Sequence, residues 1–157
     1  MMNGEGPAVC LPADLDTDII IAGRYLRTKD RSVWVAHVLE DLDPSLAPGL
    51  AGAVLVAGKN FGCGSSREQA AIALKEAGVV AVIAPSFARI FFRNAINLGL
   101  PVVECDLSCV NGEQVKFDLS AGWVEAHETK FPIRSLSPRM QEILAAGGLV
   151  EYWRCRR

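Results

Sequence analysis

Short hydrophobic runs along the chain predict four strands. Residues 19–22, 53–57, 79–84 and 101–105 are rich in β-branched or small apolar residues, and turn-forming residues bound each run. The segments between the last three runs carry apolar residues at helical spacing. Strands that alternate with helices are typical of a parallel sheet with crossover helices, so the pattern predicts an α/β fold.

The two predicted crossover helices have recognisable ends. The first is expected to begin at Ser65 or Ser66, because each of these serines is followed three residues later by Glu or Gln, as in a capping box. Gly78 predicts its end. The second is expected to run from about Ser86 to Gly99.

The C-terminal third has a different pattern. Asn-Gly at 111–112 predicts a tight turn, and apolar residues alternate with polar ones over 113–119. Ser-Pro at 137–138 predicts the start of a helix, Gly-Gly at 147–148 its end, and a short strand is expected from Leu149. The chain is therefore expected to add antiparallel strands to the parallel sheet.

Composition and charge narrow the class of protein. The 157 residues are 50% hydrophobic and 22% charged, as expected for one packed domain over residues 1–157. The formal net charge of −2 argues against nucleic-acid binding, which needs a basic surface. No apolar run is long enough to span a membrane, and the first residues lack the features of a secretory signal. We therefore expect a cytoplasmic protein with neither a nucleic-acid nor a membrane partner.

The cysteines do not form a metal-binding pattern. They include no Cys-x-x-Cys pair and no Cys/His group with the spacing of zinc ligands. We expect reduced, largely buried thiols and no metal site among them. The five are Cys10, Cys63, Cys105, Cys109 and Cys155.

The segment 59–68 is the chemical centre of the chain. It lies where a buried strand is predicted to end and a helix to begin, which is where open α/β sheets bind their ligands. Gly62 and Gly64 allow the backbone to turn and to approach a ligand closely. The segment has neither the spacing of a phosphate-binding loop nor the third glycine of a dinucleotide-binding fingerprint, so a nucleotide is not the expected ligand.

Arg67 indicates that the ligand of this segment is an anion. A positive charge in the first turn of a helix opposes the helix dipole, unless something negative binds there. A guanidinium suits a carboxylate, because it donates two parallel hydrogen bonds. In the alternative reading, Ser65 and Ser66 only cap the helix and Arg67 is a surface residue.

Two other features offer weaker candidates. Residues 14–20 resemble a calcium loop, but Ile19 stands where the loop needs glycine and Tyr25 where it needs a bidentate Glu, so calcium is excluded. His37 and His127 have no partners in a motif, and we expect each to be a structural or solvent-facing side chain.

Several segments together resemble one family. NFGCGSSRE at 60–68, SFARI at 86–90 and NLGL at 97–100 resemble the swivel domain of aconitase-type hydro-lyases. DLDTDII at 14–20 resembles the start of the same domain, and YLRT at 25–28 resembles a loop of its stand-alone form. At this length, the chain is similar to the free-standing small subunits of aconitase-type isomerases that act on isopropylmalate or homoaconitate.

The resemblance implies a fold, a partner and a reaction. The fold would be a swivelling β/β/α domain that docks on a large subunit carrying a [4Fe–4S] cluster, with the active site between the two. This chain would hold no cofactor of its own. The cluster iron would bind and expel the hydroxyl group of a small hydroxy di- or tricarboxylate, and rehydration would place the hydroxyl on the neighbouring carbon.

The resemblance also implies roles for individual residues. Ser65 would be the catalytic base that removes the proton of the substrate, and Arg67 would bind a substrate carboxylate. Ser66 would add a hydrogen bond to the substrate. Thr17 and Asp18 would line the substrate site.

Arg27 bears on the identity of the substrate. The resemblance implies that the loop 25–28 faces the variable arm of the substrate, which is an isopropyl group in isopropylmalate and a carboxylate-bearing chain in homoaconitate. A buried guanidinium without a partner is costly, which favours the carboxylate arm. However, an Arg can also pack its methylene groups against an isopropyl group and keep its charge in water. The family resemblance favours isopropylmalate, and homoaconitate, both substrates, or a non-catalytic anion-binding regulatory module remain alternatives.

Overall fold

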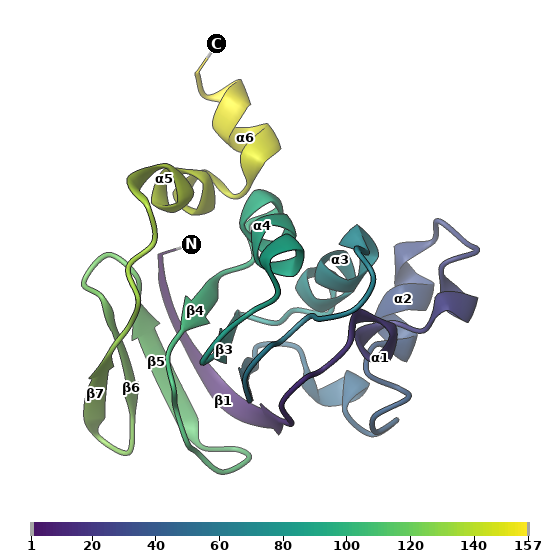
Figure 1. Ribbon diagram of the computed structural model, residues 1–157, viewed down its shortest axis with the longest axis horizontal. Helices are drawn as coiled ribbons and strands as arrows, with labels where there is room; N and C mark the ends of the chain where they lie inside the picture. The colour runs from purple at the N-terminus through teal and green to yellow at the C-terminus, as the bar shows by residue number, and fades with distance from the viewer. Residues whose placement is uncertain (1, 157) are drawn as a thin grey trace.

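The computed structural model describes residues 2–156 as one mixed seven-stranded sheet with helices around it (Figure 1). Residues 1 and 157, the ends of the expected domain, lie outside the described residues. The strand order is β4-β3-β2-β1-β5-β6-β7, in which β1 to β4 are parallel and β5 to β7 continue the sheet in antiparallel fashion. The strands are β1 (Asn3–Leu11), β2 (Val54–Ala57), β3 (Ala81–Ala84), β4 (Val102–Glu104), β5 (Gln114–Asp118), β6 (Trp123–Ala126) and β7 (Thr129–Pro132). The predicted α/β class and its antiparallel C-terminal extension are confirmed.

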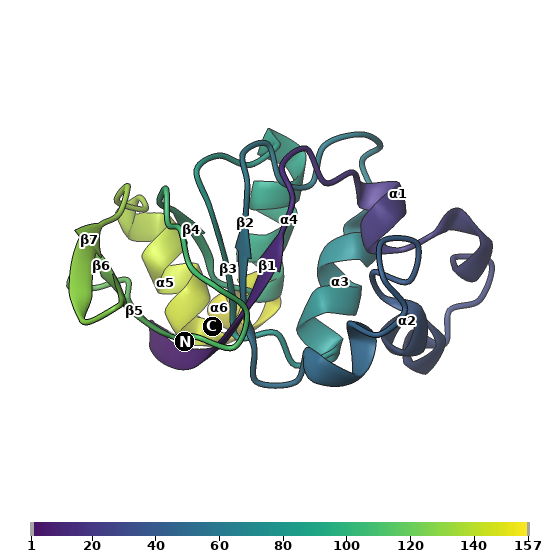
Figure 2. The ribbon, with the colours of Figure 1, turned by 90° about the horizontal axis from the view of Figure 1, so that it is seen from below.

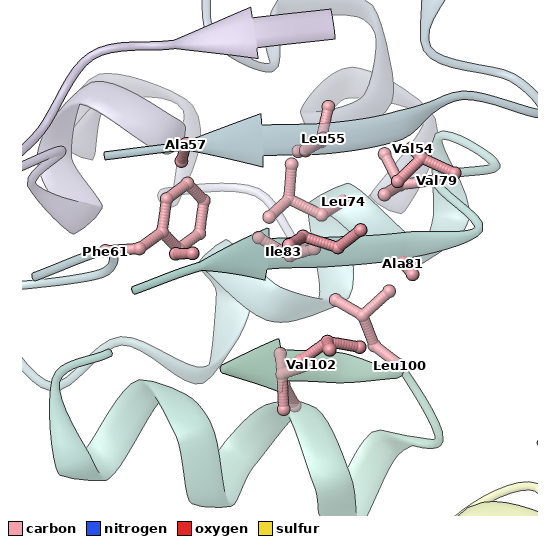
Figure 3. Packing of buried hydrophobic residues seen from close by; sticks show 14 of the residues in the cluster. Val54, Leu55, Ala57, Phe61, Leu74, Val79, Ala81, Ile83, Leu100 and Val102 are labelled. Carbon is pink, nitrogen blue, oxygen red and sulfur yellow. The ribbon is translucent and has the colours of Figure 1, made fainter. Parts of the chain in front are cut away.

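The parallel half of the sheet contains the core. Every residue of β2 and β3 is buried, because helices α3 (Glu68–Glu76) and α4 (Arg89–Leu98) lie on the crossover connections. Figure 3 shows Leu74 of α3 against Leu55 of β2 and Ile83 of β3, all fully buried. Phe61 is also fully buried and lies beyond the carboxyl end of β2, so the core reaches the loop that follows this strand.

The other helices lie at the two sides of the sheet. Helices α1 and α2 are on the side away from β5–β7 in both views (Figures 1 and 2). None of the helices within residues 2–156 is long and apolar enough to cross a membrane. The remaining elements are α1 (Thr17–Ile20), the 3-10 helices η1 (Gly23–Tyr25) and η2 (Ala47–Gly49), α2 (Arg31–His37), α5 (Pro138–Ala146) and α6 (Leu149–Arg154).

The first strand of the sheet differs from the prediction. Residues 19–22 were expected to form it, but they lie at the end of α1 and just after it. Asp16 caps this helix, since its carboxylate accepts a hydrogen bond of 2.7 Å from the backbone N–H of Asp18. The actual first strand is β1, which the hydrophobic pattern did not reveal because Gly4, Gly6 and Pro7 interrupt it.

Both crossover helices begin later than expected. Helix α3 starts at Glu68 with Arg67 as its N-cap, and neither Ser65 nor Ser66 forms the predicted capping box. Helix α4 starts at Arg89, while the hydroxyl of Ser86 accepts a hydrogen bond of 2.9 Å from the backbone N–H of Asn60. The predicted helix starts were wrong because the residues before each helix pair with a neighbouring loop instead.

The C-terminal third agrees with the prediction except at its end. Ser137 caps α5, and Gly147 ends it with a left-handed φ of 96°. The alternation over 113–119 is confirmed by β5, whereas the strand expected from Leu149 is helix α6. Asn-Gly at 111–112 does form a turn, but β5 then pairs with β1 and β6 and not with the segment before the turn.

Candidate functional site

Three loops meet at the carboxyl ends of β1, β2 and β3. The loop after β2 pairs with the loop after β1 through a bridge between Asp16 and Cys63, and with the loop after β3 through a bridge between Phe61 and Phe87. The ring of Phe61 also contacts those of Phe87 and Phe91, with centroids 6.0 and 5.1 Å away. These contacts hold the loops on the buried core, so the side chains they carry have defined positions.

A cavity of about 270 Å³ opens between these loops and the start of α4. The N-termini of α3 and α4 both lie at it, and neither helix has a side-chain hydrogen bond at its N-cap. Backbone N–H groups at the start of a helix favour an anionic ligand. Its lining includes Thr17, Gly62, Gly64, Ser65, Ser66, Arg67, Arg89, Ile90 and Asn94.

Gly62 and Gly64 give the loop its tight turns, as the sequence predicted. Their φ values are +81° and +89°, which side chains rarely adopt. A Cβ atom at residue 62 would lie 2.4 Å from Phe91, and one at residue 64 would lie 2.3 Å from the carboxylate of Asp16. The loop therefore packs so closely on its neighbours that glycine is required at both positions.

Ser65 and Ser66 are exposed at the cavity, and Thr17 holds the first of them in place. Thr17 is buried, with 2% of its surface exposed, and its hydroxyl donates a hydrogen bond of 2.8 Å to the backbone carbonyl of Ser65. The bond uses the backbone carbonyl of Ser65, so it does not involve the Ser65 hydroxyl. The hydroxyl groups of the two serines have no hydrogen-bond partner among residues 2–156, and they are available to a ligand.

Arg67 lies at the cavity and is paired with Asp18. Its Nη2 atom is 3.0 Å from Oδ1 of Asp18, and the Arg67 side chain is 28% exposed while that of Asp18 is 52% exposed. Asp18 does not line the cavity itself. The ion pair orients the guanidinium, and a planar guanidinium has further donors for a second carboxylate.

Two polar residues of the cavity were missed by the sequence analysis. Arg89 is the first residue of α4 and Asn94 lies one turn further along, and both line the cavity. Arg89 opposes the helix dipole as Arg67 was expected to do, so the same argument applied to α4 would have found it. For Asn94 the sequence carries no comparable signal. With Arg67 and Arg89, the cavity contains two positive charges, and it suits a ligand with more than one carboxylate.

Arg27 is not brought together with the other candidates. It lies in the turn after η1, is exposed, does not line the cavity and makes no ion pair with any residue from 2 to 156.

The cysteines are too dispersed to act together as ligands. Among residues 2–156, no group of three or more His, Cys, Asp or Glu side chains could hold a metal ion. Cys63 lies beside the cavity, and burial together with the nearby carboxylates of Asp16 and Asp14 raises the pKa of its thiol. At neutral pH this thiol is protonated, and Cys63 does not line the cavity, whereas Ser65 does, so Ser65 is the candidate for chemistry in this loop.

Comparisons with known proteins identify the family of this chain. Residues 50–106 match the Aconitase C-terminal domain. The 3-isopropylmalate dehydratase small subunit of Aliarcobacter butzleri is 49% identical over 145 residues, covering 89% of this chain and 87% of that protein. The methanogen homoaconitase small subunit of Methanothermobacter thermautotrophicus is 48% identical over 143 residues, covering 89% of this chain and 84% of that protein.

A solved structure extends the agreement to the whole fold. The crystal structure of 3-isopropylmalate dehydratase from Methanocaldococcus jannaschii superimposes with a TM-score of 0.93 at 43% identity, covering 99% of this chain and 95% of that chain. The resemblance inferred from the loop motifs is thus confirmed over nearly the full length. The chain belongs to the aconitase superfamily, in the family of small subunits of 3-isopropylmalate dehydratase and homoaconitase.

Proposed function

We propose that this chain is the small subunit of a hydro-lyase that interconverts 2-isopropylmalate and 3-isopropylmalate by dehydration and rehydration. The observation that supports this most directly is the cavity, which Ser65, Arg67 and Arg89 line together. The reaction requires a proton to leave the carbon next to a carboxylate and a hydroxyl group to leave the neighbouring carbon. The cavity offers groups for the first of these events.

Four side chains at or beside the cavity have a part in this proposal. Arg67 binds a substrate carboxylate through two of its N–H groups, and Asp18 orients Arg67 without contacting the substrate. Ser65 Oγ takes the proton from the substrate carbon and returns one to the alkene during rehydration. Ser66 donates a hydrogen bond to the bound acid.

Ser65 needs help from its surroundings to act as a base. Each unit by which its pKa falls requires about 1.4 kcal/mol of differential stabilisation. A helix N-terminus supplies about 0.3–1 kcal/mol at an exposed site. The exposed cavity of the single chain therefore cannot lower the pKa of Ser65 far enough for it to act as a base. A second subunit must cover the cavity and exclude water.

The departure of the hydroxyl group is assigned to the large subunit. The cysteines of this chain do not fit a [4Fe–4S] cluster, which is usually held by several thiolates close together. We therefore propose that the cluster lies on the large subunit, which docks over the cavity and completes the active site.

Reconstitution tests this proposal. The chain is mixed with the large subunit of the same organism, 2-isopropylmalate is added, and the absorbance of the conjugated alkene and the formation of 3-isopropylmalate are followed. We expect turnover only in the mixture. If the mixture shows no turnover but the chain alone binds isopropylmalate, the result would favour the non-catalytic anion-binding module instead.

Homoaconitate is the second candidate substrate. Arg27 is an exposed cation without an ion-pair partner among the described residues, and a relative that is 48% identical is named a homoaconitase small subunit. Burial of an isopropyl arm contributes about 2 kcal/mol, at about 0.8 kcal/mol per carbon, and does not require an Arg. Arg27→Val in the reconstituted complex should reduce turnover of homoaconitate and preserve that of isopropylmalate. An equal loss with both acids would show that Arg27 does not contact the variable arm.

A further inference from the structure

Three side chains contact the carboxylate of Glu40, close to the site, and a fourth, Asp41, binds one of the three, Arg24. Together with Glu40 they form what we call the Glu40 cluster, and the site described above leaves them without a function. The five residues are Arg24, Tyr25, His37, Glu40 and Asp41.

Glu40 binds three of these side chains directly. The hydroxyl of Tyr25 donates a hydrogen bond to Oε2 of Glu40, and Nη2 of Arg24 lies 3.3 Å from the same oxygen. Nδ1 of His37 lies 3.3 Å from Oε1, and the ring of His37 stacks on that of Tyr25 with centroids 4.0 Å apart. The Tyr25 hydroxyl, followed by His37 and Arg24, lowers the pKa of Glu40, so this carboxylate is ionised at neutral pH.

These contacts hold the turn formed by Gly23, Arg24, Tyr25 and Leu26 from two sides. Arg24 also donates to Asp41, with Nη2 2.7 Å from Oδ1. On the other side, Nε1 of Trp34 donates a hydrogen bond of 3.0 Å to the backbone carbonyl of Tyr25. The turn is thus fixed to helix α2 and to the segment after it.

The same turn lies beside Arg67. A Cβ atom on Gly23 would lie 3.1 Å from Nη1 and 3.7 Å from Nη2 of Arg67, so the guanidinium occupies the space next to the turn that a side chain at residue 23 would need. The other contact of this guanidinium is Asp18, 3.0 Å from Nη2. Arg67 therefore lies between its ion-pair partner and a turn that the Glu40 cluster holds in place.

We propose that Glu40 and Tyr25 are positioning residues for Arg67, which act by holding the Gly23 turn against its guanidinium. The proposal rests on the proposed function, in which Arg67 binds the substrate carboxylate. Paired hydrogen bonds to a carboxylate depend on the orientation of the guanidinium plane. Loosening the turn should therefore weaken substrate binding more than it slows the chemical step.

The principal variant is Tyr25→Phe in the reconstituted complex, because it keeps the ring stacked on His37 and removes only the donor to Glu40. We expect KM to rise severalfold, because a less well oriented guanidinium binds the substrate carboxylate more weakly, with kcat within about twofold of wild type. The double variant Tyr25→Phe/Glu40→Gln should change KM no more than the larger single change, because both act through the same contact.

Glu76→Gln is the matched control. Glu76 forms an exposed ion pair of 3.0 Å with Arg31 at the other end of α2, and so it tethers the same helix without touching the turn. This variant should leave KM unchanged. A KM for Tyr25→Phe equal to that of wild type, or an equal rise in the control, overturns the proposal.

A second measurement does not depend on turnover. In the full chain alone, the NMR signal of the Arg67 Nε–H group should shift in Tyr25→Phe and stay unchanged in Glu76→Gln, and an unshifted signal in Tyr25→Phe overturns the proposal. A wild-type complex that converts no hydroxy acid would contradict the proposed function. In that case the NMR signal of Arg67 still decides whether Tyr25 positions Arg67.

Discussion

Ser65 is the residue on which the proposed chemistry depends most directly. Its hydroxyl is exposed at the cavity and caps no helix, while its carbonyl accepts the hydrogen bond of Thr17. Ser65→Ala keeps that carbonyl, so the free energy of unfolding should change by no more than about 0.5 kcal/mol. Turnover of the reconstituted complex should fall at least a hundredfold, because general-base groups contribute about 10²–10⁴-fold. Steady-state kinetics and thermal unfolding measure the two effects, with Ser66→Ala as the comparison. Turnover above a tenth of the wild-type rate would show that Ser65 is not the base.

The loop between β2 and α3 is the element in which the identity of individual residues is most tightly constrained. Gly64→Ala places a Cβ atom against the carboxylate of Asp16, in addition to forcing alanine into a left-handed φ. Gly112 has a similar φ of +86° but open space around it, so Gly112→Ala isolates the backbone effect, which costs about 1–2 kcal/mol. Gly64→Ala should destabilise the chain by more than this, as measured by urea unfolding. Equal losses in the two variants would show that the loop moves away from Asp16 without cost.

As a whole molecule, the chain is expected to be an incomplete enzyme. Its five cysteines do not form one group. Cys10 and Cys109 lie together, with Sγ atoms 3.7 Å apart, but Cys63, Cys105 and Cys155 lie elsewhere. The purified chain should therefore contain no stoichiometric iron or sulfide and should not convert isopropylmalate, whereas adding the large subunit should restore turnover. Iron and sulfide assays, visible absorbance and kinetics provide the measurements. A brown chain that is active without a partner would contradict this expectation.

Much of the parallel half of the fold could be predicted from the sequence. Strands β2 and β3 are buried on both faces, so each is a continuous apolar run that can be recognised from the sequence, and Val102 and Val103 of β4 are buried as well. The ends of α5 were equally clear, because Ser137 and Gly147 act on groups within four residues of themselves. The glycine loop, Ser65 and Arg67 were identifiable for the same reason, since their residue types and spacing are local.

The tertiary structure decided what depends on residues far apart in the chain. Strand β1 pairs with both β2 and β5 despite its glycines and proline. The loops before α3 and α4 pair with each other, which moves the starts of both helices and brings Arg89 to the cavity. Likewise, Gly23 lies beside Arg67, 44 positions further along the chain, and no local pattern records that the two are neighbours. The sequence therefore determined the local elements and the residue types of the site, whereas packing between distant segments determined where those residues point.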